Sequence, residues 1–177
     1  TTTNHNNNNN NNNNTNIICP LEHGDDSEDP FESAAAAISA LAAQAANGKC
    51  SQESRRKVAA AQKVLEQQAT TVMVRNLTPA THTEDIIKLL ESSGFKEAFD
   101  LCRVPRDFAS GQGKGMAFVN FKSPEQACFF TWQFHGFNGY DIAPATHQGR
   151  EANYDKWRRK HKNVKDKKMK PWTAASA

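Results

Sequence analysis

The sequence predicts an α+β fold whose elements follow one another in the order β-α-β-β-α-β. Three observations between residues 70 and 155 lead to this prediction: short apolar and β-branched runs, two amphipathic segments with helix-start signals, and Gly- or Pro-containing breaks between them. A four-stranded antiparallel sheet with two helices on one face satisfies this order and leaves the other face open. We expect the function to lie on that open face.

The first half of this segment supplies a strand, a helix and a second strand. An apolar run at residues 72–74 predicts the first strand, which the turn residues 76–79 end. A capping-box pattern predicts the start of the helix, with Thr81 accepting from the Glu84 amide. Apolar residues then recur at helical spacing, at Ile86, Leu89 and Leu90. The second strand is predicted from Phe99, Leu101 and Val104.

The second half supplies the remaining three elements. A polar, Gly-rich stretch at residues 110–113 precedes an apolar run at 116–121, which predicts the third strand. Ser123-Pro124-Glu125 predicts a helix start, because proline at the first helical position loses no hydrogen bond. The apolar stripe of this second helix is Ala127, Phe130 and Phe134. The last strand is predicted at residues 151–155, which completes the split βαβ, or ferredoxin-like, pattern.

Composition divides the rest of the chain into three further segments. Residues 1–32 are Asn-rich and then acidic, with an unbroken asparagine run from Asn6 to Asn14, and we expect them to be disordered. Residues 33–69 are Ala-rich and predict two marginal helices, at 33–46 and 52–68, that either dock on the folded segment or stay mobile. The folded segment is predicted over 70–157, and a basic tail over 158–177.

The basic tail dominates the distribution of charge. Residues 156–170 hold nine Lys or Arg and one Asp, which gives +8 in a chain whose net charge is +3, so the remainder carries −5. Such a tail supplies sequence-independent attraction to phosphate groups. The other interpretations are a solvated charge run and a nuclear localisation signal.

Several classes of protein are excluded or disfavoured. No stretch approaches the ~18 apolar residues that a membrane span needs, so we expect no membrane partner. The polar start lacks the apolar region of a secretory signal, and the absence of an initiator Met suggests a fragment or a processed translation. The four cysteines form no CxxC pair and the six histidines show no metal-ligand spacing. We therefore expect free thiols in an intracellular protein of the nucleus or cytoplasm, without a metal or cofactor.

Two predicted strands carry paired motifs. Residues 114–121, KGMAFVNF, fit seven of the eight positions of the octamer basic-Gly-aromatic-Gly/Ala-Phe-Val-x-aromatic. The companion hexamer is VMVRNL at residues 72–77. The ordered pair within a βαββαβ pattern resembles the RNA recognition motif (RRM), which implies binding of single-stranded RNA on the sheet.

Strand alternation assigns these residues to faces. Ala117, Val119 and Phe121 are predicted to face the core. The candidate RNA-binding residues face the other way and are joined by the first basic residues of the tail: Met73, Arg75, Lys114, Met116, Phe118, Asn120, Arg158, Arg159 and Lys160. Bases would stack on Phe118 while cations meet phosphates.

Two methionines depart from the motif. Met73 and Met116 stand where stacking aromatics are usual. Since stacking contributes ~1–3 kcal/mol per base, their loss predicts an affinity weaker by about a hundredfold. The alternative is that both provide apolar cover beneath a terminal extension.

A narrower resemblance covers residues 70–157, about half of the chain. TTVMVRNL at 70–77, RVPRDF at 103–108, GKGMAFVNF at 113–121 and the aromatic segment 132–137 resemble the C-terminal RRM of the Mei-two-like family of meiotic RNA-binding regulators. The long connection at 136–149 is similar as well, whereas family members usually carry an aromatic where Met116 stands. The resemblance implies RNA binding and a role in meiosis or development.

Two rival functions are weighed against RNA binding. The Gly-rich residues 110–115 fail the spacing of a phosphate-binding P-loop, and no nucleophile, base and orienter occur together, so we expect no enzyme. The serious rival is a protein-interaction module that uses acidic residues of the first helix, Glu84, Asp85 and Glu91. Three aromatics are left open: Tyr154 lines either the platform or the core, and Trp157 and Trp172 either stack on bases or clamp the tail.

Overall fold

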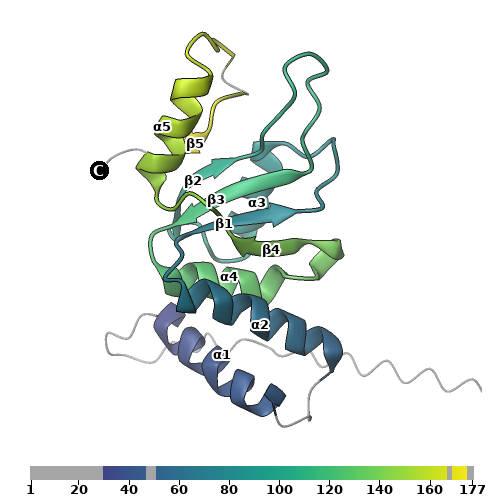
Figure 1. Cartoon of the computed structure of the whole chain (residues 1–177), viewed down its shortest axis with the longest axis vertical. Coiled ribbons are helices and arrows are strands. Elements are labelled where there is room, and N and C mark those ends of the chain that lie inside the picture. The colour runs from purple at the N-terminus through teal and green to yellow at the C-terminus, as the bar shows by residue number, and fades with distance from the viewer. Residues whose placement is uncertain (1–29, 47–50, 167–168, 175–177) are drawn as a thin grey trace, which may run out of the picture.

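The computed structural model describes residues 30–46, 51–166 and 169–174, and Figure 1 shows their arrangement. The described strands form one antiparallel sheet in the order β4-β1-β3-β2-β5. Their bounds are β1 Thr71–Arg75, β2 Phe99–Arg103, β3 Met116–Phe121, β4 Asp141–Pro144 and β5 Trp172–Thr173. The predicted βαββαβ fold is confirmed, and β5 adds a strand that was not predicted.

Two helices cover one face of the sheet, as predicted. They are α3, Thr83–Ser92, and α4, Pro124–Phe134. Helix α4 begins as expected, because Ser123 accepts from the Gln126 amide and the Gln126 side chain accepts from the Ser123 amide.

The start of α3 lies one residue later than predicted. The Asp85 carboxylate accepts from the His82 amide at 2.8 Å, so His82 and Asp85 replace Thr81 and Glu84 at the helix start. The Thr81 hydroxyl instead bonds to the Thr78 hydroxyl. The two candidate pairs are adjacent, and a sequence pattern does not resolve a shift of one residue.

The core lies between the sheet and the helices. Ala117, Val119 and Phe121 of β3 all point into it, which confirms the face predicted by alternation. Around Phe95, ring contacts run to Phe121 at 5.8 Å and to Phe130 at 5.6 Å. The third strand is therefore fixed with its other face turned away from the core.

The two Ala-rich helices dock on the domain. Helix α1 spans Pro30–Ala46 and α2 spans Gln52–Glu66, and both pack against α4. Their apolar side chains Ile38, Ala61 and Val64 belong to the same core as β1 and β3. The acidic residue Glu32, predicted to be in a disordered segment, lies in the first turn of α1, while the asparagine run lies outside the described residues.

The predicted last strand is wrong. The strand that pairs with β1 is β4, with Val74 opposite Ile142, and it lies inside the predicted connection 136–149. Residues 150–160, which include the predicted strand 151–155, form helix α5, Arg150–Lys160. Strand β4 has four residues and a single buried side chain, Ile142, so its alternation is too short to stand out.

The basic segment after α5 folds back on the sheet. Strand β5 pairs with β2, with Trp172 opposite Cys102, and the Trp172 ring lies 4.9 Å from that of Phe99. Trp172 therefore clamps the chain end to the domain. Arg158, Arg159 and Lys160, predicted as the start of a tail, form the last turn of α5.

The predicted free thiols can be checked at two positions. Cys102 and Cys128 are free and buried, and burial raises the pKa of both thiols, that of Cys128 to about 11. Cys19 and Cys50 lie outside the described residues. Within the described ranges, no helix is both long and apolar enough to cross a membrane.

Candidate nucleic-acid interface

Three side chains form a row across the face of the sheet that points away from the core. Met73 of β1 lies opposite Phe118 of β3, and Arg103 of β2 lies opposite Phe118 on its other side. Directly opposed residues of antiparallel strands are close enough for their side chains to interact. The row therefore offers a thioether, an aromatic ring and a guanidinium next to one another.

Helix α5 stands over one side of this face and turns part of it into a cleft. The cleft has a volume of about 340 Å³, and Met73, Leu101 and Phe118 contribute to its lining from the sheet. Leu101 is 1% exposed and Trp157 of α5 is 5% exposed, yet neither belongs to the main core. Both also line the cleft, so α5 packs on the β2 side of the face, near β5 (Figure 1). Phe118 stays half-buried and accessible from the cleft. We call this hollow the α5 cleft.

A network of hydrogen bonds holds the start of α5 against the sheet. The Thr71 amide donates to the Gln148 side chain at 2.7 Å, and the Gln148 side chain donates to the Thr71 carbonyl at 2.9 Å. The Gly149 amide donates to the Thr71 hydroxyl at 2.9 Å, and the same hydroxyl donates to Asn120 at 2.6 Å. Asn153 of α5 also donates to Thr71. Because the network is partly buried and joins Thr71 to both Gly149 and Asn153, it fixes the start of the helix that walls the cleft.

The α5 cleft is basic. Its lining includes four cations, Arg103, Lys114, Lys156 and Lys160. His147 and His161 line it as well. Among the described residues that line it, none is Asp or Glu. Desolvation, and then the charges of Arg103, Lys160 and Lys114, lower the pKa of His161. The imidazole therefore senses a positive potential, which favours an anionic ligand.

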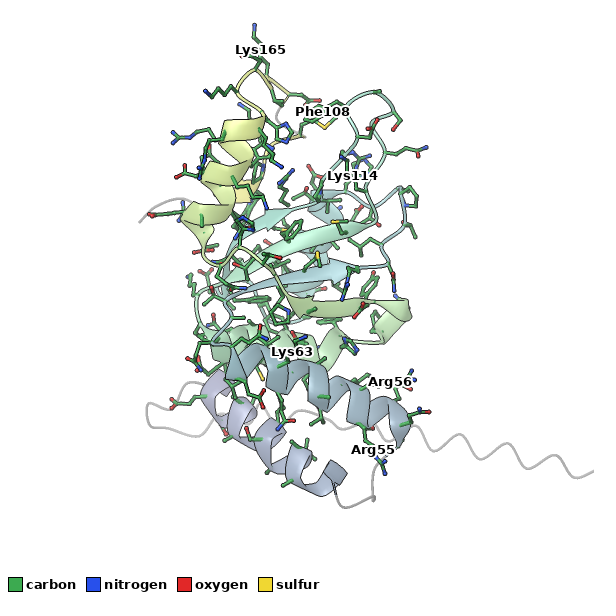
Figure 2. All side chains as sticks on the ribbon, viewed as in Figure 1. Arg55, Arg56, Lys63, Phe108, Lys114 and Lys165 are labelled. Atoms are coloured by element: carbon green, nitrogen blue, oxygen red, sulfur yellow. The ribbon has the colours of Figure 1, made fainter. Side chains whose placement is uncertain are left out.

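The loop between β2 and β3 borders the cleft at the end of α5. Phe108 is 52% exposed, and its ring centroid lies 4.9 Å from that of His161. The loop is shaped by Arg106, which donates to the carbonyls of Gly111 and Thr81. Hydrogen bonds from Ser110 and Ala109 lower the pKa of Asp107, which stays ionised in the turn. Figure 2 shows Phe108 on this loop, with Lys114 nearer the sheet.

The structure brings some of the predicted site residues together and separates others. Met73, Lys114, Phe118 and Lys160 line the α5 cleft. Arg159 lines a second hollow, beside Phe108. The other predicted residues outside the α5 cleft are Arg75, paired with Asp141 at 3.0 Å; Met116, opposite Arg75; and Arg158, paired with Asp155 at 3.0 Å.

Asn120 does not take the predicted place on the open surface. It is 4% exposed, accepts from Thr71 and donates to the Asp100 carboxylate at 2.7 Å. Its partner Thr71 also accepts from Gly149 and Asn153 at the start of α5, so Asn120 reaches α5 only through Thr71. Because its carboxamide is buried and bonded, Asn120 is not free to meet a base.

Several residues of the cleft were missed by the sequence reasoning. They are Arg103, Lys156 and His161. Arg103 lines the cleft with Leu101, whereas Phe99 belongs to the core, because the register of β2 shifts between Phe99 and Leu101. Alternation counted from Phe99 would therefore have placed Arg103 on the core face. Lys156 and His161 belong to α5 or its end, where a strand was predicted at 151–155.

The comparisons with known proteins agree with this fold. Residues 72–131 match the family model described as "RNA recognition motif". Together with the strand order, the match shows that this part of the chain has the RRM fold. A search of the curated proteins found no match to the chain.

Three of the solved structures similar to this chain are described as RRM or RNA-binding domains. "Structure of Rna15 RRM with bound RNA (GU)" is 16% identical, with a TM-score of 0.42, and covers 51% of this chain and 98% of that chain. The second RRM domain of yeast poly(U)-binding protein Pub1 is 23% identical, with a TM-score of 0.35, and covers 45% of this chain and 98% of that chain. The RNA-binding domain of Hrp1 in complex with RNA is 20% identical, with a TM-score of 0.36, and covers 44% of this chain and 46% of that chain.

Proposed function

We propose that this protein binds single-stranded RNA on the open face of its sheet, as a binding protein and not as an enzyme. The observation that carries the proposal is the α5 cleft, where an accessible aromatic ring, Phe118, lies among four cations with no lining carboxylate in the described chain. The match of residues 72–131 to the RRM family model supports the same function.

Each part of the cleft has a role in this proposal. A base stacks on Phe118, with Met73 beside it as a polarisable apolar contact. The cations meet the phosphates, because counterion release from the backbone supplies much of the affinity. Lys114 approaches from the β2–β3 loop and Lys160 from α5, so the RNA backbone is held from two sides.

The biological setting is proposed on resemblance alone. The similarity of residues 70–157 to the Mei-two-like family favours an intracellular regulator of meiotic or developmental RNAs, in the nucleus or the cytoplasm. Crosslinking the protein to RNA in cells and sequencing the RNA tests this setting. Recovery of transcripts unrelated to meiosis or development would contradict it.

The binding function is tested by a double substitution in the cleft, Phe118→Ala with Lys114→Ala. The loss of one base stacked on an aromatic ring removes ~1–3 kcal/mol of binding free energy. We therefore expect binding to a single-stranded RNA pool to weaken by at least about tenfold. Fluorescence anisotropy at low salt measures the affinity, and circular dichroism checks the fold.

A matched control removes an aromatic ring and a cation elsewhere. Phe137 is 47% exposed and Lys63 is exposed on α2, so Phe137→Ala with Lys63→Ala should leave RNA affinity within about twofold. Equal losses in both double variants would show that the cleft is not the site.

The alternative function is a protein-interaction module with weak or no RNA binding. The exposed carboxylates of α3, Glu84, Asp85 and Glu91, favour it, since they offer an acidic surface away from the cleft. If the intact protein binds no single-stranded RNA even at low salt, this function replaces the first.

A further inference from the structure

Arg103 is a charged group held in an unusual environment. Its side chain is half-buried at the end of β2 and faces the α5 cleft. Desolvation lowers the pKa of its guanidinium. Within residues 30–46, 51–166 and 169–174, the guanidinium of Arg103 makes no hydrogen bond or ion pair with another residue. A partly desolvated cation without a counter-charge is costly, and an anion in the cleft would remove that cost.

The neighbours of Arg103 add further positive charge to the cleft, which favours a bound anion more strongly. Lys114 and Lys160 line the same cleft, and together with Arg103 they repel the protonated form of His161. These groups come from three places in the chain: the end of β2, the β2–β3 loop, and the end of α5. The fold thus gathers like charges that the sequence keeps apart.

The size and the floor of the cleft limit what the anion can be. A volume of about 340 Å³ lies at the lower end of the range of small-ligand pockets, ~300–1,000 Å³. Phe118 is the cross-strand neighbour of Arg103, and both residues line the cleft. One nucleotide, with a flat base and an attached phosphate, matches this pair of groups.

We propose that Arg103, with Lys114 and Lys160, forms a pocket for one phosphate of the nucleotide whose base stacks on Phe118. The inference rests on the proposed function and adds to it the residue that binds the phosphate. Arginine suits this role because its planar fork donates two parallel hydrogen bonds to phosphate oxygens. Conversely, Arg75 and Arg158 are already paired with carboxylates and are not part of the pocket.

The first test uses the unaltered protein and two small probes, uridine monophosphate and uridine. A bound phosphate neutralises the charges around His161, so the monophosphate should raise the pKa of this imidazole, measured by NMR titration of its ring protons. Uridine carries no phosphate and should leave that pKa unchanged. Equal behaviour of the two probes would overturn the inference.

The second test substitutes the arginine. Hydrogen bonds to charged groups contribute strongly to the free energy of binding. Arg103→Gln should therefore weaken binding of single-stranded RNA by about tenfold to a hundredfold. The slope of log K against log salt should become shallower by about 0.7, the value for one phosphate contact on a single strand. Arg103→Lys keeps the charge and should restore the slope but only part of the affinity.

The control is Arg55→Gln, on an exposed position of α2 far from the cleft in Figure 2. It should leave the affinity, the salt slope and the His161 pKa unchanged. If Arg103→Gln matches this control while Phe118→Ala still weakens RNA binding, the phosphate pocket is wrong and the proposed function stands. If the unaltered protein binds no RNA, both the phosphate pocket and the proposed function are wrong.

Discussion

Asn120 joins neighbouring strands of the β-sheet through a single buried carboxamide. Its oxygen accepts from two threonine hydroxyls, those of Thr70 and Thr71, and its nitrogen donates to Asp100. A buried polar group that keeps its hydrogen-bond partners contributes to stability. Removing it leaves those partners unsatisfied, which lowers the free energy of unfolding. Asn120 therefore holds the Thr71 hydroxyl, which in turn accepts from Gly149 and Asn153 at the start of α5.

Removing this carboxamide should destabilise the domain. Asn120→Ala leaves the Thr71 hydroxyl and the Asp100 carboxylate without this partner, so we expect the free energy of unfolding to fall by about 1–3 kcal/mol. Urea denaturation followed by circular dichroism measures it. Asn163→Ala, at an exposed position, serves as the control and should change stability by less than about 0.5 kcal/mol. An unchanged denaturation midpoint for Asn120→Ala would show that the network contributes nothing.

Among the elements, α5 determines how the sheet can be used. Its first residues are bonded to β1, its Trp157 packs on the sheet, and its last turn carries three cations. A sheet of this fold would otherwise present an open face. With α5 in place, part of that face is a basic cleft, which Lys160 of the last turn lines, and Arg159 lines the hollow beside Phe108.

Neutralising the last turn of α5 should reduce the salt dependence of RNA binding. The substitutions Arg158→Gln, Arg159→Gln and Lys160→Gln remove up to three phosphate contacts, so the slope of log K against log salt should become shallower by about 1.5–2. Anisotropy titrations at several salt concentrations give the slope. The matched control removes the same charge from α2, at Arg55, Arg56 and Lys63, which Figure 2 shows on the opposite part of the molecule. Equal changes in slope would mean that net charge alone, and not its position, governs binding.

Helix α1 should contribute to the stability of the whole domain. Ile38 is 2% exposed and belongs to the core shared with the sheet, although it comes from an Ala-rich helix. Ile38→Ala should therefore lower the free energy of unfolding by about 2–4 kcal/mol. Ser33→Ala, at an exposed position of the same helix, should have little effect. If thermal denaturation gives the same midpoint for both variants, α1 is not part of the cooperative unit.

At the scale of the whole molecule, helices α1 to α4 and the sheet share one core. This core includes Cys102 from β2 and Cys128 from α4, and burial keeps both thiols protonated by raising their pKa. The thiolate is the reactive form, so both residues should be inert as long as the domain stays folded.

The two buried thiols therefore report on global unfolding. In a variant with Cys19→Ser and Cys50→Ser, a thiol reagent at pH 8 should modify Cys102 and Cys128 only through opening of the fold. Addition of urea should increase both rates in parallel, as mass spectrometry of the modified peptides would show. Fast modification of either residue in native buffer would contradict the shared core.

The parts of the fold that were predicted correctly rest on local signals. The apolar run in β3 and the Ser123-Pro124-Glu125 start of α4 are both determined by neighbouring residues. The last strand was missed because β4 is four residues long, and the helix after it was missed because the strand that completes the βαββαβ order was placed at 151–155. Short elements are stabilised by their partners in the sheet, and a single sequence does not display those partners.

The sequence by itself determined that residues 70–155 hold a βαββαβ domain whose third strand turns Phe118 away from the core. That follows from period-two alternation, a local property of the chain. Only the tertiary structure decided that α1 and α2 join the core, that Thr71 anchors the start of α5, and that Arg103, Lys114 and Lys160 meet around one cleft. These arrangements depend on contacts between residues far apart in the chain, and such contacts form only when the elements pack together.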